Sequence, residues 1–252
     1  MNTPPVEIPA PSRGTLPAHT VFARLERPAL ADRSSITVIA AMDAAFTGAM
    51  CELIWADGST KVMPVHRWDR TACETDLQLL VDMCQGPTLD VGCGPGRLTG
   101  ALTVRGVPTL GIDISPQAVR QTRERGGAAI CQDIFDPMPG SDAWQHILLA
   151  DGNIGLGGHP VRLLRRVAEL MRPDGTVLVE LAGPGVGWVH RQVRLRVGQR
   201  VSRPFSWATV GLEGIDQVAK EAGLMVTDLR CMTDRHVATL KHARSAPKMM
   251  GP

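Results

Sequence analysis

From Pro87 onward the sequence alternates short apolar segments with amphipathic ones. Five strands are expected, over residues 88–92, 108–114, 128–134, 145–151 and 175–182. The clearest helix spans residues 160–172, where Pro160 suits a first helical turn and apolar residues recur on one face. Such alternation implies a parallel sheet with right-handed crossovers and helices on both faces. Ligands bind such sheets beyond the carboxyl ends of the strands, where the strand order reverses.

The end of this region departs from a plain parallel sheet. Apolar positions predict a helix over residues 212–222, followed by two strands over about 225–232 and 235–243. The link between these strands is too short for a parallel crossover, so the pair must be antiparallel. The predicted fold class is therefore α/β, with a doubly wound, mostly parallel seven-stranded sheet that ends in an antiparallel hairpin.

A front piece precedes this region. Residues 35–49 are apolar enough for a helix, and a β-hairpin is predicted around the turn at Asp57 and Gly58. The spacing of Thr71 and Glu74 is typical of a capping box, which would open a helix that runs to Cys84.

The chain divides into four parts by composition. Prolines are dense near the N-terminus, so we expect a largely disordered arm there. The expected parts are the arm 1–33, the front piece 34–85, the main domain 86–244 with an insertion at 183–210, and a tail 245–252.

A glycine-rich segment lies where the first main strand should turn into a helix. Asp90 is followed by Gly92, Gly94 and Gly96, and glycines let a main chain turn tightly and approach a ligand. The dinucleotide fingerprint G-x-G-x-x-G would need a glycine at position 97, which is Arg97. The D-x-G-x-G-x-G spacing instead resembles the first motif of the class I methyltransferases that depend on S-adenosylmethionine.

The resemblance implies a Rossmann-like methyltransferase fold with S-adenosylmethionine as cofactor. It continues at the next two strand ends, where Asp113 would accept the ribose hydroxyls and Asp133 would contact the adenine amino group. The main chain near Asp133 and the Ile134 side chain would flank the adenine ring. The implied cofactor site comprises Asp90, Gly92, Cys93, Gly94, Gly96, Asp113, Ile114, Asp133, Ile134 and Asp151.

Methyl transfer from a sulfonium needs mainly positioning, and a general base is required only for a hydroxyl or a protonated amine. The candidate catalytic residues are Asp151, His159 and His190. Asp151 has an equal alternative role, which is to bind the main chain of the glycine loop, and lone histidines are more often structural. Glu180 is a further acid near the expected substrate side, and His66 would reach the site only if the front piece folds over it as a lid.

The insertion at 183–210 combines aromatic residues with arginines. Apolar and polar residues alternate around Val193, which predicts a half-buried strand with Arg194 and Arg196 on its open face. These guanidinium groups would recognise a carboxylate or phosphate on the acceptor. The alternative is a solvated edge strand that its charges protect from aggregation.

Bulk properties limit the partners. The net charge of +2 gives no reason to expect a nucleic-acid partner, and no long apolar run or secretory signal is visible. None of the six cysteines forms a C-x-x-C pair and no zinc-ligand spacing occurs, so we expect reduced, buried cysteines, no metal and a cytoplasmic location. The sequence does not indicate an oligomeric state.

These features predict methyl transfer from S-adenosylmethionine to a small-molecule acceptor, with oxygen or nitrogen as nucleophile. One alternative is an RNA or protein methyltransferase, although residues 151–154 read Asp-Gly-Asn-Ile rather than the N/D-P-P-aromatic motif of nitrogen methylation. A second is a non-catalytic module that only binds S-adenosylmethionine. A third is an NAD(P) enzyme, which the glycine spacing disfavours.

Overall fold

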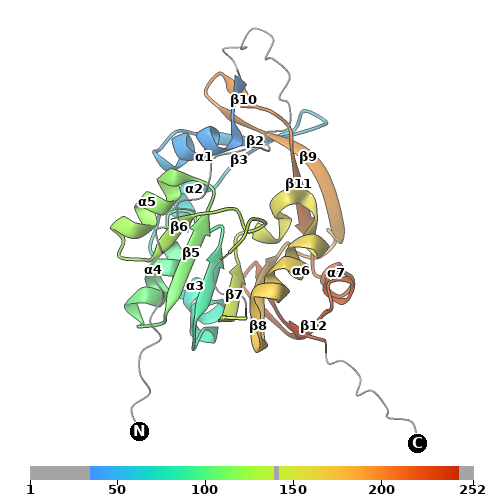
Figure 1. Ribbon diagram of the computed structural model, residues 1–252. Helices are drawn as coiled ribbons and strands as arrows, with labels where there is room; N and C mark the ends of the chain where they lie inside the picture. The colour runs from blue at the N-terminus through green and yellow to red at the C-terminus, as the bar shows by residue number, and fades with distance from the viewer. Residues whose placement is uncertain (1–34, 139–141, 244–252) are drawn as a thin grey trace, which may run out of the picture. The chain divides into compact units, whose positions relative to one another are not determined.

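The computed structural model describes residues 35–138 and 142–243, and their strands form two sheets (Figure 1). The larger sheet has seven strands in the order β12-β13-β8-β7-β4-β5-β6. Its strands are β4 (Thr88–Val91), β5 (Thr109–Asp113), β6 (Ala129–Cys131), β7 (Trp144–Leu149), β8 (Met171–Leu181), β12 (Leu224–Met232) and β13 (Arg235–His242). The arm 1–33 and the tail 245–252 expected from the sequence lie outside the described residues.

The pairing within this sheet confirms the predicted fold class. Strands β6, β5, β4, β7 and β8 run parallel, whereas β13 is antiparallel to both β8 and β12. The chain moves from β4 outward to β5 and β6, and then returns to β7 on the other side of β4. The order therefore reverses at β4, and ligands in such sheets bind beyond the carboxyl ends of the strands at that point.

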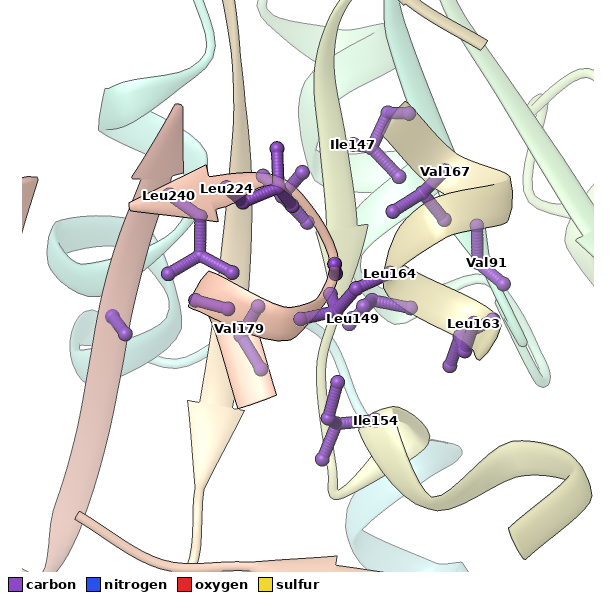
Figure 2. Close-up of a cluster of buried hydrophobic side chains, with 14 of the residues drawn as sticks. Val91, Ile147, Leu149, Ile154, Leu163, Leu164, Val167, Val179, Leu224 and Leu240 are labelled. Atoms are coloured by element: carbon purple, nitrogen blue, oxygen red, sulfur yellow. The ribbon is translucent and has the colours of Figure 1, made fainter. Parts of the chain in front are cut away.

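Helices cover both faces of the seven-stranded sheet. They are α3 (Glu74–Leu79), α4 (Arg97–Val104), α5 (Pro116–Glu124), α6 (Pro160–Leu170) and α7 (Ile215–Glu221), with 3₁₀ segments η1 (Val81–Met83) and η2 (Asn153–Gly158). Along β7, Ile147 and Leu149 pack in the cluster that includes α6 and α7 (Figure 2), and Leu148 packs with α3 and α4 on the other face. This alternation is the consequence of the two-residue period of a strand.

The second sheet joins two segments that are far apart in the sequence. Its strands are β1 (Ser35–Ile36), β2 (Cys51–Trp55), β3 (Thr60–Val62), β9 (Trp188–Val197), β10 (Arg200–Ser202) and β11 (Phe205–Val210). Antiparallel pairing of β2 with β9 brings the front hairpin and the insertion together, and we call the result the hairpin–insertion sheet. Helix α1 (Val38–Phe46) packs on it through Ala41 and Ala45, and the short helix α2 (Val65–Trp68) follows β3.

Two local predictions were wrong. The helix expected from Thr71 begins at Glu74, because the capping box is formed by Cys73 and Asp76, whose Oδ2 accepts the Cys73 N–H at 2.9 Å. It ends at Leu79 and gives way to the 3₁₀ turn η1 instead of running to Cys84. The strand expected over residues 175–182 begins earlier, at Met171, and its pairing with β7 shifts register between Trp144 and His146.

The cysteines are only partly as expected. All six are free, but three are buried and three are exposed, and the exposed ones are Cys73, Cys131 and Cys231. Over residues 35–138 and 142–243, no helix is long and apolar enough to cross a bilayer. The same residues contain no group of three or more side chains arranged to bind a metal ion.

Candidate functional site

The glycine loop joins β4 to α4 at the point where the strand order reverses. Gly92, Gly94 and Gly96 all have positive φ, at 70°, 53° and 86°, a region that other residues enter at a cost. Gly96 is the N-cap of α4, which begins at Arg97. A Cβ atom on Gly96 would lie 2.8 Å from the main chain of Thr122, so that glycine is needed for packing.

The other two glycines differ in what they face. A Cβ atom on Gly92 would lie 2.6 Å from the Asn153 side-chain nitrogen, which donates to the carbonyls of Val91 and Gly92 at 2.9 and 3.0 Å. On Gly94 a Cβ atom would meet only the ring of Phe46, at 3.9 Å. Gly94 is therefore the member of the loop whose main chain a ligand can approach.

Asp90 is buried beneath the glycine loop, and its carboxyl group is not accessible from the loop. Only 2% of the residue is exposed, and its Oδ2 accepts a hydrogen bond from Thr99 Oγ1 at 2.7 Å. Burial raises the pKa of this carboxyl to about 6, although the Thr99 hydrogen bond acts in the opposite direction. The acid that opens the motif thus ties β4 to the first turn of α4.

Asp113 connects the glycine loop to the end of β5. Its Oδ2 accepts the Gly94 N–H at 3.0 Å and its Oδ1 accepts the Ser115 N–H at 2.8 Å. Burial raises the pKa of Asp113, while these two hydrogen bonds lower it. Ser115 is the N-cap of α5, and its hydroxyl also hydrogen-bonds Asp43 of α1. The orientation of Asp113 is therefore set by main-chain donors on both sides.

The end of β6 contributes an exposed acid. Asp133 Oδ1 accepts the Phe135 N–H at 2.9 Å, in a turn that leaves the carboxylate accessible. Ile134 is 5% exposed and belongs to the main core, whereas Ile114 after β5 is 40% exposed. Because β4, β5 and β6 are neighbours and parallel, Asp90, Asp113 and Asp133 lie together at the carboxyl ends of these strands.

The end of β7 carries Asp151 in a left-handed conformation, with φ of 51°. Its side chain forms an ion pair with Arg97, and its N–H donates to Glu180 Oε2 at 2.8 Å. Binding the main chain of the glycine loop was the alternative role expected for Asp151. Asn153 has that role instead. Arg97 was not predicted as a site residue, because a charge in the first turn of a helix is ordinarily exposed.

The two candidate histidines lie together. His159, just after η2, stacks on His190 of β9 with ring centroids 5.6 Å apart and planes 19° apart. Both are exposed, and within the described ranges neither ring forms a hydrogen bond to an acid. His66 is exposed on α2. The structure thus pairs His159 with His190 without giving either the acid partner that a general base often has.

The hairpin–insertion sheet shows the predicted alternation. Val193 and Leu195 are buried, and Arg194 is exposed. Arg196 forms an ion pair with Glu52 of β2 at 2.8 Å. Arg191 lies opposite Trp207 of β11, whose indole packs against η2 beside the end of β7. Arg196 is therefore used between strands, while Arg191 remains exposed opposite Trp207.

Comparisons with known proteins agree with this geometry. Residues 88–175 match the model of a methyltransferase domain family. The chain is 32% identical over 156 residues to trans-aconitate 2-methyltransferase of Rhodococcus jostii RHA1, over 58% of each chain. It is 30% identical over 171 residues to the enzyme of the same name from Mycolicibacterium gilvum PYR-GCK, over 64% of this chain and 63% of that one. The matched region spans less than two thirds of these curated relatives.

Solved structures resemble the fold over a longer stretch. A methyltransferase from Bacteroides fragilis, solved with S-adenosyl-L-homocysteine, superposes with a TM-score of 0.69 at 22% identity, over 82% of this chain and 94% of that chain. The 1,6-didemethyltoxoflavin-N1-methyltransferase of Burkholderia thailandensis superposes with a TM-score of 0.54 at 16% identity, over 88% of this chain and 95% of that chain. At these identities the likeness concerns the fold.

Proposed function

Because the chain belongs to the class I methyltransferases that depend on S-adenosylmethionine, we propose that it transfers a methyl group from that donor to a small-molecule acceptor. One observation carries the proposal. The glycine loop lies at the carboxyl ends of the strands together with the acids at the ends of β5 and β6. The Gly94 N–H donates a hydrogen bond to Asp113.

The residues at these strand ends fit the donor. A Cβ atom on Gly94 would meet only the ring of Phe46, so the main chain there has room for the close approach of an adenosyl group. Each oxygen of Asp113 accepts one main-chain hydrogen bond, and a carboxylate has further lone pairs with which to accept ribose hydroxyls. We assign the adenine amino group to Asp133 and the apolar contact with the ring to Ile114, because Ile134 is buried in the core.

When bound, S-adenosylmethionine supplies a methyl group that its sulfonium already activates toward in-line displacement. The protein contributes positioning, for which the loop, Asp113 and Asp151 provide fixed main-chain and carboxylate groups. If the acceptor reacts through a hydroxyl or a protonated amine, Asp151 and the His159–His190 pair are the proton-accepting groups that we propose. The exposed position of the two rings gives an acceptor direct access to them.

We propose further that the acceptor is a small carboxylic acid. Two curated relatives of the chain are named trans-aconitate 2-methyltransferase, and trans-aconitate carries three carboxylates. Arg191 and Arg194 of β9 are exposed guanidinium groups on opposite faces of the hairpin–insertion sheet, and guanidinium pairs with carboxylate through two hydrogen bonds. Trp55 and Trp207 add half-buried aromatic surface to the same sheet.

The test is calorimetric titration with S-adenosylmethionine and with NADH, followed by methyl transfer to a panel of di- and tricarboxylic acids and their amides. We expect micromolar binding of S-adenosylmethionine, no binding of NADH, and turnover of acids but not of amides. Asp113→Ala should weaken donor binding by roughly 1–3 kcal/mol, the scale of lost hydrogen bonds to a charged group. Asp216→Ala, an exposed acid on α7, is the matched control. Binding of NADH without binding of S-adenosylmethionine would falsify the proposal.

A further inference from the structure

A closed ring of ion pairs and hydrogen bonds lies next to the glycine loop. Arg97 of α4 pairs with Asp76 of α3 and with Asp151 after β7. Arg235 of β13 pairs with the same Asp76 at 2.5 Å and with Glu180 of β8 at 2.7 Å. Glu180 Oε2 in turn accepts the N–H of Asp151 at 2.8 Å, which closes the ring.

The ring has an excess of negative charge. It contains three carboxylates, at Asp76, Glu180 and Asp151, but only two guanidinium groups. Burial would raise the pKa of Asp76, but Arg97 and Arg235 outweigh it and hold that pKa well below its usual range. Asp76 is therefore ionised, and both arginines remain charged because their pKa values are raised by these acids.

Asp151 is the least compensated of the three carboxylates, and burial raises its pKa although Arg97 acts in the opposite direction. The side chains of Asp76 and Glu180 are 2% and 13% exposed, and Glu180 accepts two hydrogen bonds from one guanidinium group, at 2.7 and 2.8 Å. Asp151 differs, since a third of its side chain is exposed and only its Oδ2 meets Arg97. Among the described residues, its Oδ1 accepts no hydrogen bond.

Contacts with neighbouring residues also fix the orientation of Asp151. A non-glycine residue in the left-handed region is strained, and such strain persists only where neighbouring contacts hold it. Here Arg97 holds the carboxylate and Glu180 holds the N–H. Two residues further on, Asn153 binds the carbonyl of Gly92. The ring therefore fixes an exposed negative charge beside the glycine loop, at the carboxyl end of β7.

We propose that this charge makes the site prefer the cationic methyl donor to its product, and that Arg97 and Glu180 are positioning residues for Asp151. The inference rests on the proposed function. S-adenosylmethionine carries a sulfonium, an ammonium and a carboxylate, and loss of the methyl leaves a neutral thioether with its electron pair on sulfur. The product thus has one positive charge fewer, so a fixed carboxylate attracts it less than the donor. The chemical consequence is weaker product inhibition.

The experiment compares three ligands on one variant by calorimetry. Asp151→Asn keeps the size of the side chain and removes its charge. The ligands are S-adenosylmethionine, S-adenosylhomocysteine and sinefungin, in which an amine-bearing carbon replaces the methylated sulfonium. We expect the variant to bind the two cationic ligands about tenfold more weakly, which corresponds to about 1.4 kcal/mol, and to bind S-adenosylhomocysteine within twofold of the parent.

Asp133→Asn is the matched control, since it neutralises an acid that we assign to adenine. The change should weaken the binding of all three ligands by the same factor, because all three contain the adenine group. Arg97→Lys keeps the positive charge but loses the planar fork that meets two carboxylates, so it should lower the preference for the donor by about threefold while the protein stays folded. Thermal unfolding of each variant reports whether the fold is retained.

Two outcomes overturn the inference. If Asp151→Asn weakens the binding of the donor and of the product equally, Asp151 contributes to binding without discriminating charge. If it changes neither, the carboxylate does not face the ligand. Both outcomes leave the proposed function standing, because that function fails only if the unaltered protein binds neither S-adenosylmethionine nor its product.

Discussion

The two sheets of this protein touch at η2, where a Cβ atom on Gly155 would lie 2.0 Å from the carbonyl oxygen of Ala208 in β11. They are built over different distances along the chain. The proposed cofactor site, at the carboxyl ends of the seven-stranded sheet, is built from consecutive elements, β4 through β6, within residues 88–131. The hairpin–insertion sheet instead pairs β2 with β9, and its Glu52–Arg196 ion pair joins residues 144 positions apart.

This difference separates the two tasks of the proposed enzyme. Donor binding depends on a loop and side chains whose conformations are set by near neighbours, such as the Gly94 N–H on Asp113. Acceptor binding depends on a sheet in which either partner segment is incomplete without the other. The first part can stay constant while the second changes its side chains, so acceptors can differ among proteins that share one donor site.

The sharpest way to break this separation is at Gly94. Gly94→Ala places a methyl group in the open space of the loop, and we expect donor binding to fall at least 100-fold while the fold is kept. Alanine at a φ of 53° costs roughly 1–2 kcal/mol of strain, so a modest drop in Tm is expected as well. Calorimetry with S-adenosylmethionine measures the first effect and thermal unfolding the second.

Gly106→Ala supplies the control for strain alone. Gly106 has a φ of 74° and nothing within 4 Å of its would-be Cβ atom, but it lies in the turn after α4. It should lower Tm by a similar amount and leave donor affinity unchanged. Equal binding losses in both variants would mean that Gly94 acts through backbone strain and that no ligand approaches it.

The second prediction compares leucines in the cores of the two sheets. Leu195 of β9 is 2% exposed in the hairpin–insertion core, and Leu164 of α6 is fully buried in the main core. Each change to alanine should lower the free energy of unfolding by about 2–5 kcal/mol. Leu195→Ala should abolish most acceptor turnover yet keep donor affinity within threefold, because only the acceptor side is loosened. A parallel loss of donor affinity would show that the sheets do not separate the tasks.

The same contrast governs what could be predicted from the sequence. The motif from Asp90 to Gly96 and the acids at 113 and 133 follow from strand periods and glycine spacing, which are local. The pairing of β2 with β9 was not predicted, because short strands of similar alternation do not specify their partner. Arg97 was missed for a related reason: its burial depends on Asp76 and Asp151, which no period in the sequence connects to it.

The third prediction concerns pH and the buried acid of the motif. The pKa of Asp90 is about 6 in the folded protein, whereas an unfolded aspartate ionises near 3.9. The folded state is therefore favoured below pH 4 and loses this contribution as the pH rises through 6. Asp90→Asn cannot ionise, so its stability relative to the parent should rise from pH 4 to 6 and then level off, by about 3 kcal/mol in total. Urea unfolding at pH 4, 5, 6 and 7 measures this difference, and a gap that does not depend on pH would contradict it.

The smallest expected effect tests how the distant segments of the hairpin–insertion sheet recognise each other. Glu52 and Arg196 lie directly opposite on β2 and β9. Glu52→Arg or Arg196→Glu alone places like charges opposite each other, which should lower Tm by about 1–3 °C, and the double exchange should restore it. The pair is partly exposed, with 21% and 38% of the two side chains accessible, so 1 M salt should erase most of the difference. Donor affinity should not change in any of the three variants. If the single exchanges instead lowered acceptor turnover and the double exchange did not restore it, Arg196 would act on the acceptor itself, and the ion pair would not be what aligns the two segments.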